Sequence, residues 1–131
     1  MLNDVRSRLH LSKYAYNTDE YQFRPKLERL LGTDDLSGIH LRLGQFPVFQ
    51  RSNDHSTILH SVFYANFGHS LKSTYEAFIR EFIAPIVSEP FYYQTIPTFR
   101  VGLPGNKFVG EFHKDSKYNH QPYEVNFNLS I

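Results

Sequence analysis

The chain has 131 residues, of which 40% are hydrophobic and 16% aromatic, and it carries a formal net charge of +1. This composition predicts one folded domain over residues 1–131 rather than a disordered chain, and the near-neutral charge without a run of Lys or Arg indicates no nucleic-acid partner. The absence of cysteine excludes disulfides, and no apolar segment suits a membrane span or a signal peptide, so we expect a cytoplasmic protein without a membrane partner.

Helical signals dominate the region of about 1–90. Residues 1–24 show no clear period, so we predict no regular element there. Residues 25–32 begin with Pro and end with Gly, which is typical of a short helix, because Pro suits a first turn and Gly a C-terminal cap. In residues 36–50, apolar and polar side chains alternate around position 40, which favours a short strand whose length Pro47 limits.

Two longer helices are predicted next. Asp54 is a candidate N-cap for a helix that runs to about position 65 and carries an apolar stripe at helical spacing. The clearest signal lies at about 74–87, where apolar side chains recur on one helical face. A capping box at 73–76 predicts the start of this helix, and Pro85 predicts a kink in its last turn.

β-Strand signals occupy residues 91–131. Residues 91–101 and 107–112 are rich in aromatic and β-branched side chains, and the Pro-Gly turn at 103–106 between them suits paired strands. Residues 123–131 alternate apolar and polar side chains, which predicts a strand with one buried face. Because the sequence ends with this strand, we expect a chain truncated within a sheet, whose open edge would cause poor solubility or dimerisation.

The candidate chemical site lies at the end of the second predicted strand. In a strand, the side chains of residues i and i+2 project to the same side, so those of His113 and Asp115 would point together. An imidazole nitrogen and a carboxylate oxygen on one face are two legs of a facial triad that binds a transition metal. A triplet of this kind also arises by chance, as an ordinary surface His and Asp.

A longer motif surrounds this pair of residues. It consists of residues 94–115, 118–120 and 124–127. These stretches resemble the 2-oxoglutarate/Fe(II) oxygenase superfamily, in the branch that includes a streptomycin-biosynthesis enzyme and its uncharacterised bacterial and phage relatives. The resemblance is densest over about 91–131 and fainter over 74–87 and 54–64.

The resemblance implies an α+β protein built on a double-stranded β-helix, or jelly roll, with flanking helices and only the first part of the barrel present. It also implies Fe(II) held by His113, Asp115 and a distal His, with 2-oxoglutarate as co-substrate and with O2 and a small-molecule substrate as partners. The activity implied is a dioxygenase reaction, such as hydroxylation of a small metabolite or sugar-like compound. The sequence ends before the distal His and the basic residue that binds 2-oxoglutarate, and His120 does not match the distal position, so we expect this chain to be inactive alone.

Three further polar residues are candidates for cofactor binding. Asn126 and Asn128 lie on the polar face of the last predicted strand, where they could orient the metal ligands or reach 2-oxoglutarate, or could form a solvated face. Arg100 lies on the strand before the turn and could meet a carboxylate, although such an Arg is more often a surface residue. We therefore interpret Asn126 and Asn128 as evenly balanced between the two roles and Arg100 as the weaker candidate.

The other histidines lack the spacing of a metal-binding helix, in which two His lie four residues apart. They are His55, His60 and His69. We interpret them as ordinary helix and loop histidines.

Two other classes of protein stay open. A β-sandwich binding module without a catalytic metal would use the jelly-roll cleft for a sugar or a peptide. A cupin-like metal enzyme would use the same ligand pair for different chemistry, and metal identity and 2-oxoglutarate dependence would separate it from an oxygenase. A His and then an Arg or Lys encoded beyond Ile131 would favour the oxygenase, whereas a natural end at Ile131 would favour the binding module.

Overall fold

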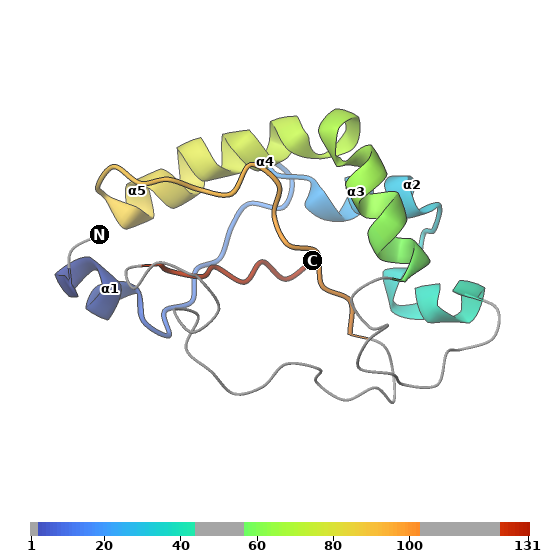
Figure 1. Ribbon diagram of the computed structural model, residues 1–131, viewed down its shortest axis with the longest axis horizontal. Helices are drawn as coiled ribbons and strands as arrows, with labels where there is room; N and C mark the ends of the chain where they lie inside the picture. Colours follow the sequence, from blue (N-terminus) through green and yellow to red (C-terminus); the bar gives the residue numbers. More distant parts are fainter. Residues whose placement is uncertain (1–2, 44–56, 103–123) are drawn as a thin grey trace.

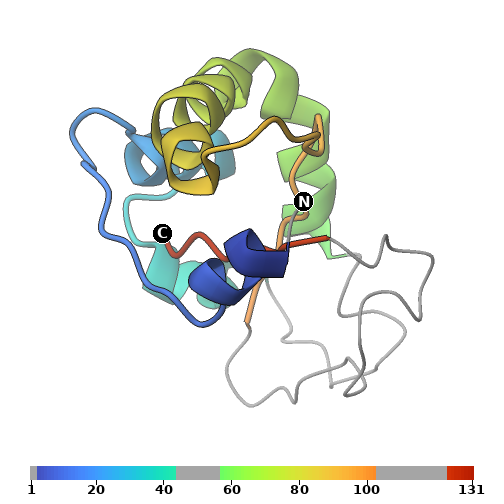
Figure 2. The same ribbon diagram turned by 90° about the vertical axis from the view of Figure 1, so that its left-hand side faces the viewer.

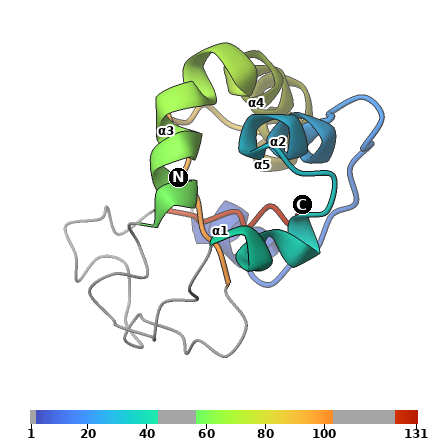
Figure 3. The same ribbon diagram turned by 90° about the vertical axis from the view of Figure 1, so that its right-hand side faces the viewer.

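The computed structural model describes residues 3–43, 57–102 and 124–131, and every regular element among them is helical (Figure 1). In chain order the elements are α1 (Asn3–Leu9), α2 (Phe23–Leu31), the 3-10 helix η1 (Leu36–Leu43), α3 (Ile58–Ser70), α4 (Lys72–Phe78), the π-helix η2 (Ile79–Ile83) and α5 (Ala84–Val87). Figures 2 and 3 show two layers: α4, η2 and α5 form a rod beside α2, while α1 and η1 lie on the other side of the extended segment 124–131. In the described part of the chain no helix is apolar over a length that would cross a membrane.

The rod formed by α4, η2 and α5 confirms the helix predicted for residues 74–87, because the three elements follow one another without a break. Its first turn differs from the prediction. Leu71, rather than Ser73, precedes the helix, and no side-chain cap forms. Since Leu71 is itself helical and its N–H donates to the Phe67 carbonyl of α3, the chain enters α4 with this backbone group already bonded, and no capping box is needed.

Pro85 changes the helix just upstream of itself. Proline has no N–H, and its ring crowds the carbonyl four residues earlier, which here belongs to Glu81. The helix is wider at this point, and the Ala84 N–H donates to the Ile79 carbonyl five residues earlier. Pro85 therefore gives a π-turn before it rather than the kink predicted for the last turn.

The two other predicted helices form with shifted ends. α3 begins after Thr57, which is extended, and runs to Ser70 rather than to about 65. The predicted cap of α3, Asp54, lies outside the described residues. The helix predicted for 25–32 is confirmed as α2.

Gly32 ends α2 as the sequence predicts. Its φ is 70°, a left-handed conformation that glycine adopts readily because it lacks a Cβ. The Gly32 N–H donates to the Arg29 carbonyl (3.3 Å) and the Thr33 N–H to the Glu28 carbonyl (2.9 Å). This pair of bonds is the Schellman motif, which satisfies carbonyls that the helix end would leave free.

The strand predicted within residues 36–50 is wrong where the structure describes it, because Leu36–Leu43 form η1. The Asp35 carboxylate accepts hydrogen bonds from the Ser37 backbone N–H (3.1 Å) and from the Ser37 hydroxyl (2.5 Å). A side chain that bonds to the backbone nearby offers an alternative to a strand ladder. The alternating pattern is therefore overridden by a local turn that starts a helix.

The predicted α+β jelly roll is also wrong, because no β-strand occurs among the residues that the structure describes. Residues 91–102 and 124–131 have strand-type sequences and are not helical, but no ladder joins either of them to a neighbour within the described ranges. The remaining predicted strand, 107–112, lies outside those ranges. A double-stranded β-helix requires paired strands, so this fold class is not supported.

Helix side chains, rather than strands, bind the backbone of the segment 91–102. The Phe99 N–H donates to the Tyr64 hydroxyl of α3 (2.9 Å), and the Tyr75 hydroxyl of α4 donates to the Gln94 carbonyl (2.6 Å). Both hydrogen bonds lie at solvent-exposed positions, so they position the backbone of the segment rather than satisfy groups that water cannot reach. The segment is therefore held along the helices as a single chain.

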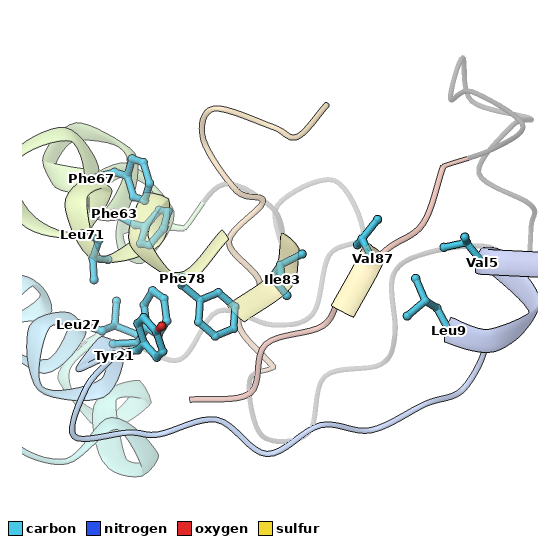
Figure 4. Close-up of a cluster of buried hydrophobic side chains, with 11 residues drawn as sticks. Val5, Leu9, Tyr21, Leu27, Phe63, Phe67, Leu71, Phe78, Ile83 and Val87 are labelled. Carbon is cyan, nitrogen blue, oxygen red and sulfur yellow. The ribbon is translucent and has the colours of Figure 1, made fainter. Parts of the chain in front are cut away.

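α1 was not predicted, since the residues before position 25 show no clear period. Val5 and Leu9 are nevertheless buried four residues apart on one face of α1. Figure 4 shows both side chains close to Val87, at the end of the core opposite the aromatic residues. Val87 is 1% exposed, so this end of the core is closed by the N-terminal helix.

Aromatic rings form the other end of the core. The Phe78 ring lies edge-on to Tyr21 and to Phe23, with ring centroids 5.3 Å apart in both pairs, and it stacks on Phe82 at 4.9 Å. These contacts join the rod to α2 and to the chain that precedes α2. Edge-to-face geometry is favoured because the positive rim of one ring meets the negative face of another.

Candidate functional site

The two predicted metal ligands, His113 and Asp115, lie outside the described residues, and their arrangement stays a prediction. Among the residues that are described, no group of three His, Asp or Glu side chains is placed to hold a metal ion. The described part of the chain therefore gives no support to the expected iron site with 2-oxoglutarate.

The three residues predicted to bind a cofactor are all exposed and lie on two different segments. Arg100 is at the end of the segment 91–102, whereas Asn126 and Asn128 are on the C-terminal segment. Arg100 and Asn128 form no hydrogen bond or ion pair with a described residue. Neither Arg100 nor Asn128 is therefore held by a described side chain, and the Arg100 guanidinium is accessible to a ligand.

A buried histidine lies beside the segment that carries Arg100. His60 is in the first turn of α3 and is 5% exposed. Its Nδ1 lies 2.9 Å from the Thr57 hydroxyl oxygen, and its ring meets the Phe99 ring edge-on at 5.4 Å. The Thr57 contact fixes the orientation of the imidazole, whose ring nitrogens can donate or accept according to their protonation.

Phe99 is the best-anchored residue of the segment 91–102. Its ring stacks on that of Phe63, with centroids 4.2 Å apart and planes within 5°. Its N–H donates to the Tyr64 hydroxyl at 2.9 Å. The backbone immediately before Arg100 is therefore fixed by both a ring and a hydrogen bond, which limits the positions that the guanidinium can reach.

We call His60, Tyr64, Phe99 and Arg100 the α3 site. The guanidinium is a planar group with several N–H donors that matches a carboxylate or a phosphate. The Tyr64 hydroxyl already accepts the Phe99 N–H, and a phenol can still donate its own proton. The α3 site therefore presents an exposed guanidinium and a phenolic hydroxyl at the surface, and the His60 imidazole lies buried beside Phe99.

The second anchor of the segment is Tyr75. Its hydroxyl donates to the Gln94 carbonyl at 2.6 Å, and its ring meets that of Tyr93 at 6.2 Å. Burial raises the pKa of Tyr75, and the nearby Tyr93 adds to the effect. The phenol therefore stays protonated, and able to donate, throughout the neutral pH range.

Sequence reasoning did not single out His60. Three scattered histidines were interpreted together as ordinary, and His69 fits that interpretation because it is exposed on α3. The sequence offers no signal that separates His60 from His69. The separation comes from the partners Thr57 and Phe99, and only the folded chain brings Phe99 to α3.

Comparison with known proteins gives one informative likeness. The chain is 31% identical over 120 residues to "Streptomycin biosynthesis protein StrG" of Streptomyces griseus, an alignment that covers 89% of this chain and 58% of StrG. No family model matches the chain, and no solved structure matches it significantly.

These findings correct the assignment to the 2-oxoglutarate/Fe(II) oxygenase superfamily. No family model supports it, and the described residues contain neither the strands of a jelly roll nor a group of side chains that could hold iron. The chain is similar to a streptomycin biosynthesis protein over most of its own length, and it spans 58% of that relative's length.

Proposed function

We propose that this chain takes part in the biosynthesis of a small molecule. The observation that carries the proposal is the alignment with StrG, which is 31% identical and covers 89% of this chain. The name of StrG places StrG in streptomycin biosynthesis. Because the alignment includes 58% of StrG, the proposal concerns the kind of process and not a particular reaction.

The partner in this proposal is a small, polar substrate or intermediate. The α3 site supports such a partner, because Arg100 is exposed and forms no ion pair within the described chain while the neighbouring Phe99 is firmly anchored. A guanidinium held in this way would favour an intermediate that carries a carboxylate or a phosphate. A neutral apolar partner would gain little from it.

The direct test is genetic. The coding region is deleted in the native host, and the metabolites of the deletion strain and of its parent are compared by liquid chromatography and mass spectrometry. We expect one product to disappear and a precursor to accumulate, and we expect the intact gene to restore the product. A deletion strain with an unchanged metabolite profile would contradict the proposal.

Complementation with variants tests the α3 site. Arg100→Ala is expected to lower product formation by roughly tenfold or more, since a hydrogen bond to a charged group contributes about 1.5–3 kcal/mol. Arg29→Ala is the matched control, because Arg29 is also exposed and forms no side-chain hydrogen bond or ion pair within the described chain. Equal product from both variants would remove Arg100 from the site.

The precursor that accumulates in the deletion strain can be used to test whether the chain converts this compound or only binds it. The purified chain is mixed with this compound, and both bound and converted compound are measured. If His113 and Asp115 carry the chemistry, as the sequence pattern predicts, their alanine variants bind the precursor but do not convert it. His69→Ala is the control for the loss of a histidine, since His69 is exposed on α3. Binding by the unaltered chain without any conversion would indicate a binding module.

A further inference from the structure

The first described residues, 3–22, cross the molecule from one end of the rod to the other, and we call them the strap. α1 lies near α5, and the chain then passes along the molecule to the start of α2 (Figure 1). In Figures 2 and 3 the C-terminal segment 124–131 lies between α1 and the rod. The strap therefore lies over this segment, which carries Asn126 and Asn128.

α1 attaches the strap to the end of the rod. Arg8 Nη2 donates to the carbonyls of Ile86 (2.8 Å) and Val87 (3.2 Å) and lies 3.3 Å from the Ser88 hydroxyl oxygen. The last carbonyls of a helix have no partner within the helix and carry its partial negative charge, so a guanidinium is a favourable cap. Val5 adds an apolar contact in the core.

Tyr16 is the middle attachment, and it links three parts of the fold. Its ring meets those of Phe78 (5.4 Å) and Phe82 (6.3 Å) on the rod. Its hydroxyl donates to the Ser130 carbonyl of the C-terminal segment at 3.4 Å. Burial raises the pKa of Tyr16, so the hydroxyl keeps its proton at neutral pH.

Little else holds the strap between its ends. Every residue from 10 to 20 is exposed except Tyr16, which is half-buried. The C-terminal segment is similar, since residues 126–131 are exposed and Val125 packs against the core. Segments with few buried contacts open at low free energy, and segments that share their contacts open together.

We propose that the strap and the segment 124–131 form one cooperative unit that opens from the rod as a latch. The Arg8 cap, the buried Val5 and Leu9, and the Tyr16 ring hold it closed against the rod. Opening separates the Tyr16 ring from Phe78 and Phe82 and uncovers the apolar surface around Phe82 and Val125.

Thiol labelling tests this proposal, because the chain has no cysteine and a single introduced thiol reports on one place. Val125→Cys reports on the C-terminal segment, and Leu27→Cys, in the buried face of α2, reports on global unfolding. The rate of reaction with an aromatic disulfide reagent is measured for each reporter in the full chain. Each reporter is combined with Arg8→Ala, which removes the cap, or with Tyr16→Phe, which removes only the hydroxyl.

We expect position 125 to react much faster than position 27 in the unaltered chain, and Arg8→Ala to speed labelling at position 125 by about tenfold, the effect of losing about 1.4 kcal/mol of interaction. Tyr16→Phe should speed position 125 by a smaller factor. Lys13→Ala and Tyr14→Phe are the controls, since both side chains are exposed on the strap without a hydrogen bond among the described residues, and neither should change either rate.

Three outcomes would overturn the latch. In the first, Arg8→Ala leaves the rate at position 125 unchanged, so that Arg8 is only a local helix cap. In the second, position 125 reacts no faster than position 27 in the unaltered chain, so that the strap does not open separately from the core. In the third, the thiol at position 125 of the chain without a further substitution reacts as fast as it does in the urea-unfolded chain, so that nothing holds the segment.

Discussion

Replacing Phe78 by alanine removes the ring around which four other aromatic side chains pack. The ring centroids of Tyr16, Tyr21, Phe23 and Phe82 lie 4.9–5.4 Å from that of Phe78, and Phe78 is 6% exposed. Truncating a buried phenylalanine to alanine costs about 3–5 kcal/mol. Aromatic pairs add about 0.5–1.5 kcal/mol beyond the area they bury. We expect Phe78→Ala to lower the free energy of unfolding by about 5 kcal/mol, out of the roughly 5–15 kcal/mol typical of a domain.

Urea unfolding, followed by circular dichroism in the helical region, measures this loss. Phe78→Leu keeps most of the volume and should cost less than about 2 kcal/mol. Tyr14→Ala, an exposed aromatic residue on the strap, should change stability by no more than about 0.5 kcal/mol. A cost for Phe78→Ala no greater than that for Tyr14→Ala would refute the assignment of the aromatic cluster as the core.

Three further substitutions test local features. Gly32→Ala should lower the free energy of unfolding in urea by about 1 kcal/mol, because φ at this position is 70°. Backbone strain is the only cost, since an added Cβ meets no atom within 4 Å. An unchanged stability would show that α2 does not need this cap. Pro85→Ala restores a backbone N–H that can donate to the Glu81 carbonyl. Hydrogen exchange should therefore find a protected amide at position 85, with no loss of protein stability. A less stable variant would contradict proline as the cause of the π-turn. The pKa of Asp35 is lowered from its usual 3.8, chiefly by the Ser37 hydroxyl, so its folded-state pKa lies below the unfolded value. The carboxylate therefore stabilises the fold above the unfolded pKa and loses that effect as pH falls through the folded pKa. Asp35→Asn should accordingly destabilise the protein at neutral pH by an amount that shrinks as the pH falls through the folded-state pKa, and a penalty independent of pH would exclude the charge as the cause.

Sequence pattern was sufficient wherever a helix carries its own signals. The apolar face at 74–87 and the Pro and Gly of 25–32 act within a few turns, and both helices formed where they were predicted. α1 was missed because it is short, and its stability comes from Val5, Leu9 and Arg8 contacting parts of the chain about 80 residues away.

Strand prediction failed for a physical reason. A strand needs a partner backbone, which side-chain alternation cannot supply. The Phe99 N–H binds the Tyr64 hydroxyl, and Asp35 turns the next residues into a helix, so strand-type sequences stay unpaired in the described chain.

For the candidate site, the sequence determined which residue types are present, and the structure decided which of them meet. Arg100 was identifiable from the sequence, but its setting depends on Phe99 stacking on Phe63 from a distant helix. His60 is no different from other histidines in the sequence, and its burial and its contacts with Thr57 and Phe99 set it apart. Helical periodicity and caps are local properties that a sequence carries by itself. Contacts such as Arg8 with α5 and Tyr16 with Ser130 join residues far apart in the chain, so they arise only after packing has brought the segments together.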